Sequence, residues 1–262
     1  KGEKGKIYRP IPRDRDQVFF VNQGVLPKVA SRRWILPKFE GFSNDIRWAE
    51  GFNFNARYFD RFFLTQANEN DWITEAKYIQ NHLTDSVIEK SIRHFPDTIY
   101  SLHGKEIIET LKTRRGQLIQ IAKKHYQALA KNVNILGSNK KEQFEINHIS
   151  NNRTEITIRK ISKKGYLKQT TYHRVFDARH TNEIRLYGFD GDDQFKLMGN
   201  EKAKIKIRII AGNGQEVVID SIKTQGKRTI IYDVKGQIDF VSSKNIKRKF
   251  SKNTNIHKYN RE

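Results

Sequence analysis

Hydrophobic positions follow two different periods along the chain. Between residues 70 and 132, apolar residues recur every three or four positions, which is typical of amphipathic helices. From Glu142 onward they alternate with polar residues or form short runs closed by glycine, which is typical of strands. The first 65 residues are rich in proline and aromatic residues, and Gln17–Val21 is the short strand that their pattern predicts.

Three helices are predicted in the middle of the chain. Asp71 is the expected N-cap of the first. Thr84 is the expected N-cap of the second, which must end near Phe95 because Pro96 follows. The third is predicted from about residue 105 to residue 131, where one face carries an apolar stripe made of Ile107, Leu111, Leu118, Ala122, Tyr126 and Leu129. The glycine at position 137 is expected to close this helical region.

The β half begins with a predicted hairpin and continues with a repeat. Residues 155–159 and 169–172 read as two strands on either side of a turn at Gly165. Three later segments then align with one another: Ile184–Gly191, Ile207–Gly214 and Thr229–Gly236. Their closing glycines are 23 and 22 residues apart, and another short apolar strand follows each. This spacing predicts a small module of stacked strands in which each unit is buried by its neighbours.

The predicted fold class is therefore α+β. Residues 1–140 are expected to form a proline- and aromatic-rich segment packed on a helical bundle. Residues 141–262 are expected to form a β-rich repeat domain. Because the chain lacks an initiator Met and ends without a cap or tail signal, we expect it to be an internal segment of a larger modular protein.

Composition narrows the chemistry. The absence of cysteine among the 262 residues excludes disulfides, thiolate metal sites and cysteine nucleophiles. The net charge is +21, and residues 1–38 alone carry ten Lys and Arg against three acids. Three explanations stay open, in this order: solvated or interface charge, an anionic membrane surface, and nucleic acid.

One acidic turn is a candidate calcium site. The stretch from Gly188 to Phe195 resembles the glycine- and aspartate-rich calcium repeat of β-roll toxins, with Asp190, Asp192 and Asp193 as the ligands that the resemblance implies. The next two copies of the turn offer few further oxygen ligands, so a calcium site here is expected to be weak. The alternative is that these polar side chains hold backbone amides of the turn.

A second candidate metal site lies near the start of the chain. Asp14 and Asp16 fall two positions apart on an extended segment, so both carboxylates can reach one hard cation. Residues 12–19 resemble the Pro-x-Asp-x-Asp-x-x-Phe strand of secretory and spore-coat kinase-like folds, which implies Mg or Mn at these two residues. It also implies that the helical bundle is a remnant of a kinase C-lobe, with the catalytic Asp and the nucleotide lobe upstream.

Three stretches together carry a wider resemblance: residues 12–20, 55–64 and 183–193. They are similar to the region that precedes the barrel in large Bacteroidota outer-membrane proteins of the surface-antigen (BamA-like) type. Some members of that family also carry a calcineurin-like metallophosphoesterase domain, whose metal ligands have no counterpart here. The resemblance implies a place in the cell envelope, associated with the outer membrane on its periplasmic or surface side.

The sequence predicts a function without assigning any catalytic residue or certain cofactor. The preferred interpretation is a soluble, non-catalytic connecting region whose partners are the other domains of the same polypeptide, upstream enzymatic parts and a downstream barrel. The first alternative is a fragment of a metal-dependent kinase-like enzyme that uses Asp14 and Asp16. The second is a basic module that binds polyanions.

Overall fold

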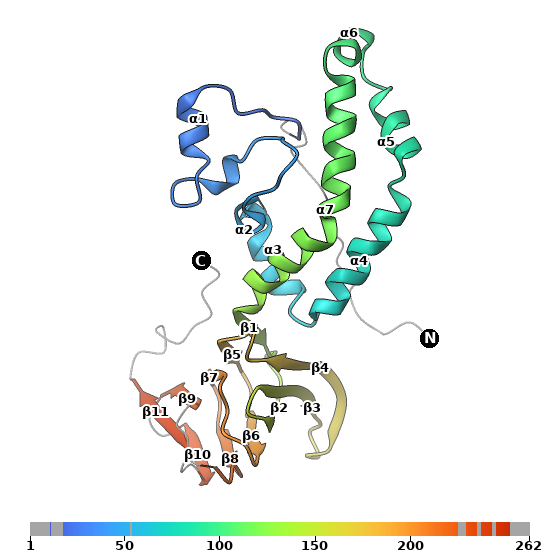
Figure 1. Ribbon diagram of the computed structural model, residues 1–262. Coiled ribbons are helices and arrows are strands. Elements are labelled where there is room, and N and C mark those ends of the chain that lie inside the picture. Colours follow the sequence, from blue (N-terminus) through green and yellow to red (C-terminus); the bar gives the residue numbers. More distant parts are fainter. Residues whose placement is uncertain are drawn as a thin grey trace. The chain divides into compact units, whose positions relative to one another are not determined.

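The computed structural model describes residues 11, 18–52, 54–224, 229–234, 237–242 and 245–251 (Figure 1). The chain is mixed α/β, so the predicted α+β class is confirmed at that level. It divides into two compact units, one formed by residues 1–55 and 76–121 and the other by residues 56–75 and 122–262. We call them the helical unit and the solenoid unit.

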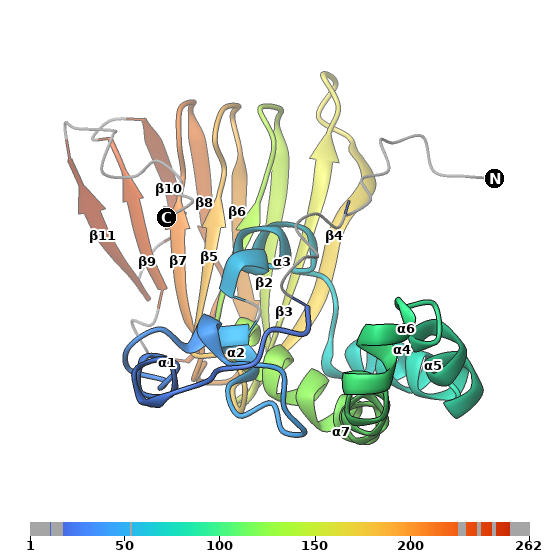
Figure 2. The same ribbon diagram turned by 90° about the horizontal axis from the view of Figure 1, so that it is seen from above.

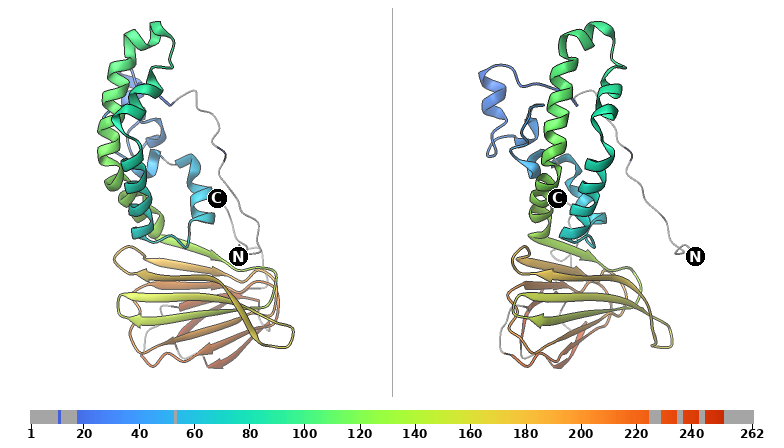
Figure 3. Two further views of the ribbon diagram at one scale, coloured as in Figure 1. Left: turned by 90° about the vertical axis from the view of Figure 1, so that its right-hand side faces the viewer. Right: turned by 45° about the vertical axis from the view of Figure 1, so that its right-hand side comes forward.

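The helical unit combines short elements with a helix pair. Its first elements are α1 (Val25–Ala30), η1 (Pro37–Phe39), α2 (Ala49–Phe52) and η2 (Phe54–Ala56). They are followed by α5 (Asp85–Ile92), α6 (Asp97–Ile99), the π-helical turn η3 (Tyr100–Gly104) and the first two thirds of α7 (Lys105–Ala130). In Figures 1 and 3, α5 lies beside α7, and the two helices share a core of Ile88, Ile92, Ile107 and Ile108.

Two of the helix predictions hold and one is corrected. The Oγ1 of Thr84 accepts a hydrogen bond from the Val87 amide, as expected for the N-cap of α5. The long helix α7 matches the predicted range. Asp71, in contrast, is not an N-cap, because α4 (Glu69–His82) begins earlier. Asn68 caps this helix: its Oδ1 accepts from the Asp71 amide at 3.2 Å, while Asp71 Oδ2 accepts from the Asn68 amide at 2.8 Å.

The strand predicted at Gln17–Val21 is wrong in its described part. Residues 18–21 form a turn and an irregular segment. The reason is aromatic packing: the ring of Phe19 lies 5.0 Å from that of Phe42 and 5.7 Å from that of Phe95, both edge-on. These contacts leave Phe19 partly buried against the core that α5 and α7 share.

The solenoid unit contains α3 (Arg57–Phe63), the start of α4, the end of α7 and the described strands, which form two sheets. The first sheet is parallel throughout, in the order β1 (Asn132–Leu136), β5 (Glu183–Tyr187), β7 (Lys206–Ile210), β9 (Thr229–Asp233) and β11 (Ile246–Phe250). The second has the order β10 (Ile238–Ser242), β8 (Glu216–Asp220), β6 (Gln194–Gly199), β2 (Glu142–Ser150), β3 (Arg153–Ile161) and β4 (Leu167–Asp177).

The chain passes back and forth between the two sheets. Each coil places one strand in the first sheet and the next strand in the second, so that coils stack side by side (Figure 2). The two sheets face each other as layers (Figure 3). The segments aligned from the sequence pair in register, with Ile184 opposite Ile207 and Ile207 opposite Thr229. The predicted stacked repeat is therefore confirmed, and the predicted hairpin forms β3 and β4.

Ladders of identical or similar side chains fill the space between the sheets. Phe144, Phe195, Val218 and Phe240 are consecutive partners across the second sheet. The rings of Phe144 and Phe195 stack with their centroids 4.8 Å apart. Such ladders arise because coils of nearly constant length place equivalent residues next to each other in the sheet. Strands outside the predicted hairpin and repeat also form, among them β11, which pairs with β9. The sequence pattern places Asn132–Leu136 at the end of the helical region, whereas in the structure β1 pairs with β5 and opens the solenoid.

Candidate functional site at the helix-to-solenoid junction

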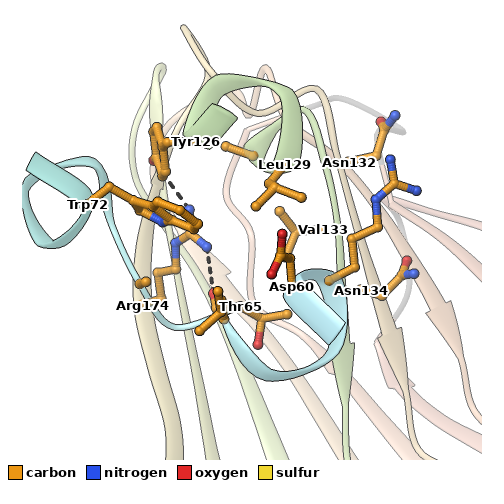
Figure 4. A pocket seen from close by; sticks show the side chains of 13 residues that line it. Asp60, Thr65, Trp72, Tyr126, Leu129, Asn132, Val133, Asn134 and Arg174 are labelled. Carbon is orange, nitrogen blue, oxygen red and sulfur yellow. Dashed lines mark hydrogen bonds between the residues drawn. The ribbon is translucent and has the colours of Figure 1, made fainter. Parts of the chain in front are cut away.

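The last turns of α7 continue almost directly into the solenoid. A single residue, Lys131, separates the end of α7 from β1, and its carbonyl oxygen accepts a hydrogen bond of 2.9 Å from the Asn182 amide just before β5. Residues 56–75 lie against the same place and line a small cleft together with the end of α7, β1 and β4 (Figure 4). We call this region, within the solenoid unit, the junction.

A buried histidine–aspartate pair ties α3 to α7. Asp60 Oδ2 and His125 Nε2 lie 2.9 Å apart, and their side chains are 12% and 7% exposed. The Trp72 ring meets the imidazole edge-on, with centroids 5.2 Å apart. The other ring nitrogen, Nδ1, is buried and has no hydrogen-bond partner in the described part of the chain. The pair therefore fixes the orientation of the imidazole from one side only.

Arg174 on β4 makes the second set of contacts. Its Nη1 donates to the Thr65 carbonyl oxygen at 2.5 Å and its Nη2 donates to the Tyr126 hydroxyl at 3.3 Å, as Figure 4 shows. The guanidinium also lies over the Phe176 ring, 4.4 Å from its centroid. A buried arginine on β4 that contacts a loop and a helix at once connects both of them to the sheet.

The Thr65 carbonyl oxygen accepts a further hydrogen bond of 2.9 Å from the Tyr172 hydroxyl. Burial raises the pKa of Tyr172 above its ordinary value, against the opposing charge of Arg174, so the phenol stays protonated and continues to donate. Thr65 is thus the point at which two β4 side chains hold the segment that precedes α4.

The space at the junction limits its chemistry. The cleft has a cavity volume of about 20 Å³, which is room for about one water molecule. The side chains around it can hold and orient a proton, but a substrate larger than water does not fit between them. The arrangement is suited to fixing a helix on a sheet.

A second polar feature is a column of buried carboxyl groups inside the solenoid, which we call the acidic column. Glu142 and Glu216 are the first residues of β2 and β8, Asp193 stands at the equivalent position directly before β6, and Asp233 closes the column from the end of β9. All four are buried, and Asp193 and Glu216 are completely so. Asp193 Oδ1 accepts from the Glu142 amide at 2.8 Å, and Glu142 Oε2 accepts from the Ser138 amide at 2.6 Å.

Burial raises the pKa values of these carboxyl groups. It raises the pKa of Asp193 to about 9, with the nearby Glu142 and Glu216 adding to the effect. Burial and the neighbouring Asp233 raise the pKa of Glu216 to about 8. Burial also raises the pKa of Asp233. Glu216 and Asp233 influence each other's pKa, and both Glu216 carboxylate oxygens and Asp233 Oδ2 are buried without a hydrogen-bond partner among the described residues. At neutral pH the carboxyl groups of Asp193 and Glu216 therefore hold protons in the folded chain.

The predicted calcium ligands do not converge on one point. Asp190 Oδ1 accepts from Asn213 Nδ2 at 2.9 Å, and Asp192 Oδ1 accepts from the Gln215 amide at 3.0 Å, so both brace the next coil. Asp193 turns inward to the acidic column. No group of three or more His, Asp or Glu side chains in the described residues is arranged to hold a metal. Asp14 and Asp16 lie outside the described residues.

The sequence holds a signal for the acidic column but none for the junction. Glu216 follows Asp193 by one repeat, as Asn213 follows Asp190, so the repeat length itself was a signal for the column. Asp60, His125 and Arg174 carry no comparable signal, because they come from three distant segments with unrelated patterns.

Comparisons with protein-family models, curated proteins and solved structures found no match for the chain. Every helix in the described residues is too short or too polar to cross a lipid bilayer.

Proposed function

We propose that this chain is a non-catalytic connecting region of a cell-envelope protein, which joins upstream domains to an outer-membrane barrel. The proposal combines the family resemblance of the sequence with one structural observation. That observation is the junction, where Asp60 and His125 join α3 to α7 and Arg174 joins β4 to Tyr126 of α7 and to the loop at Thr65. Buried polar contacts of this kind resist bending between the two elements they join.

The solenoid suits the same role. Each coil of about 22 residues adds one strand to each sheet, which lengthens the stack by about 4.8 Å. In the described strands the interior is occupied mainly by the ladders of aliphatic and aromatic side chains, so the stack is stiff. A stiff stack keeps a constant distance between whatever is attached to its two ends.

The kinase-like alternative remains a separate prediction. It rests on Asp14 and Asp16 and on the interpretation of α4, α5 and α7 as part of a kinase C-lobe. Its test is direct: the purified chain should bind Mn²⁺, and the double substitution Asp14→Ala/Asp16→Ala should abolish that binding. Unchanged Mn²⁺ affinity in the double variant would remove this alternative.

The connecting role is tested in the full-length polypeptide that contains this segment. Protease sites are introduced on either side of the segment, and cell membranes are fractionated before and after cleavage. We expect the intact polypeptide in the outer-membrane fraction, the upstream domains released by either cut, and no ATP turnover by the purified segment. A cytosolic polypeptide, or ATP turnover that Asp14→Ala abolishes, would contradict the proposal.

A further inference from the structure

Residues 25–39 of the helical unit expose an unusual amount of apolar surface. Val25 is 77% exposed, Leu26 81% and Trp34 76%, and four further apolar side chains of the segment are exposed as well: Val29, Ile35, Leu36 and Phe39. A folded surface rarely leaves so many large apolar side chains together in water without a partner. We call residues 25–39 the apolar–basic segment.

The same segment carries charge of one sign. It contains Lys28, Arg32, Arg33 and Lys38 and no acidic residue. Lys28, Arg32 and Arg33 also line a concavity of about 650 Å³ together with Trp34, Arg47 and Trp48. The residue after the segment, Glu40, is buried; its carboxylate accepts hydrogen bonds from the Arg47 and Trp48 amides at 2.7 and 3.1 Å and lies 3.3 Å from Arg47 Nε. Cationic groups therefore surround an open hollow while the adjacent acid faces inward.

The segment is nevertheless held in a defined conformation. The amides of Ser31, Ile35 and Leu36 donate to carbonyl oxygens within the segment at 2.9 to 3.0 Å. Asn22 Nδ2 donates to the Phe39 carbonyl oxygen at 2.6 Å. A backbone whose polar groups are already paired can enter an apolar medium at low cost, because few hydrogen bonds to water are lost.

We infer that the apolar–basic segment is a docking surface for an anionic lipid bilayer. Leu26 and Trp34 enter the boundary between headgroups and acyl chains, and Lys28 and Arg32 contact lipid phosphates. This is the combination by which interfacial segments bind membranes: apolar and aromatic side chains for insertion, and Lys and Arg for anionic headgroups. Nucleic acid would match the cations but would leave the exposed valine and leucine side chains without a favourable contact. The inference does not depend on the connecting role.

The test uses the purified chain and vesicles of phosphatidylcholine with or without one third phosphatidylglycerol, in sedimentation assays. We expect binding to the anionic vesicles only, weakening as salt rises. Each cation near the surface contributes about 1 kcal/mol, so Lys28→Gln/Arg32→Gln should weaken binding by about 25-fold. The matched control Lys90→Gln/Lys105→Gln removes two exposed cations from the same unit and should keep wild-type affinity.

A second pair of variants separates insertion from charge. Leu26→Ser/Trp34→Ser should weaken vesicle binding at least 10-fold, and Leu102→Ser/Tyr166→Ser, which changes two equally exposed side chains elsewhere, should not. Because Leu26 and Trp34 are exposed, the circular dichroism of this variant should match that of the parent. No sedimentation with anionic vesicles at low salt would overturn the inference. Equal losses of vesicle affinity in Lys28→Gln/Arg32→Gln and Lys90→Gln/Lys105→Gln would overturn it too. The same holds if the chain binds DNA more tightly than vesicles and Leu26→Ser/Trp34→Ser leaves the DNA affinity unchanged.

Discussion

Asp60 Oδ2 lies 2.9 Å from His125 Nε2, although the two residues are 65 positions apart in the sequence. This contact brings α3 to the last third of α7 at the place where the helix gives way to β1. Both side chains are largely buried, so neither can exchange its partner for water without a cost.

Loss of this pair should destabilise the solenoid unit. Asp60→Ala leaves a buried imidazole nitrogen without a partner, and we expect the free energy of unfolding to fall by about 1–3 kcal/mol. Urea denaturation followed by circular dichroism measures the change. Glu69→Ala is the control, because Glu69 is more exposed and lies 3.6 Å from His180, so its loss should cost at most about 0.5 kcal/mol. Equal effects of the two substitutions would contradict the assigned role.

Arg174→Met should loosen the junction locally. The methionine keeps much of the buried volume but removes the donors to Thr65 and Tyr126. We expect faster amide hydrogen exchange in residues 56–75 and unchanged exchange in β6 and β8, which pack through the apolar ladders. Uniformly faster exchange throughout the solenoid would show that Arg174 supports the whole core and not the junction.

The acidic column should make the solenoid less stable in alkali. The ordinary pKa values of Asp193 and Glu216 are 3.8 and 4.5, and burial raises them to about 9 and about 8. Between these limits the folded chain holds protons that the unfolded chain has released. The free energy of unfolding therefore falls as the pH rises, on the order of 1 kcal/mol per pH unit for each group.

Glu216→Gln tests this slope. The neutral amide cannot lose a proton, so the variant should show a weaker loss of stability between about pH 6 and about pH 9 than the parent. Glu201→Gln, at an exposed position, is the control and should leave the slope unchanged. Urea midpoints across this pH range provide the measurement. An identical slope in the parent and in Glu216→Gln would mean that the column is not protonated in the folded chain.

Replacing two of the glycines by alanine should change the stability of the fold in opposite directions. Gly212 has a φ of 108°, and a Cβ there would meet the Phe189 carbonyl oxygen of the preceding coil, so Gly212→Ala should cost well over 1 kcal/mol. Gly116 lies in α7 with open space around it, so Gly116→Ala should stabilise by about 0.5–1 kcal/mol. Thermal melts of the two variants distinguish these outcomes, and a tolerated Gly212→Ala would contradict the close stacking of the coils.

The repeat is predictable from the sequence because the strand-and-glycine segments recur at nearly constant spacing. Ile184, Ile207 and Thr229 could be aligned from the sequence, and the same residues pair in the first sheet. Local capping at Thr84 was also predictable, since the bond spans three residues. These features depend on neighbours in sequence or on a fixed period, and both are visible without a structure.

The rest depends on contacts that no local pattern encodes. The repeat length places Glu216 next to Asp193, but a glutamate after a glycine turn resembles an ordinary solvated residue, and its complete burial follows only from the stacking of the neighbouring coils. Strand β1 was missed because its partner β5 lies far along the chain. Gln17–Val21 is a short apolar run that reads as a strand, but Phe19 packs edge-on against Phe42 and Phe95, far along the chain.

The single residue between α7 and β1 has a consequence for how this chain can change in evolution. Side chains turn by about 100° per residue in a helix and alternate by 180° in a strand, so the link sets the phase between them. One inserted or deleted residue at Lys131 would turn β1 over, exposing Val133 and Ile135 and burying Asn134. Substitutions at this link are tolerable, whereas a change in its length is not.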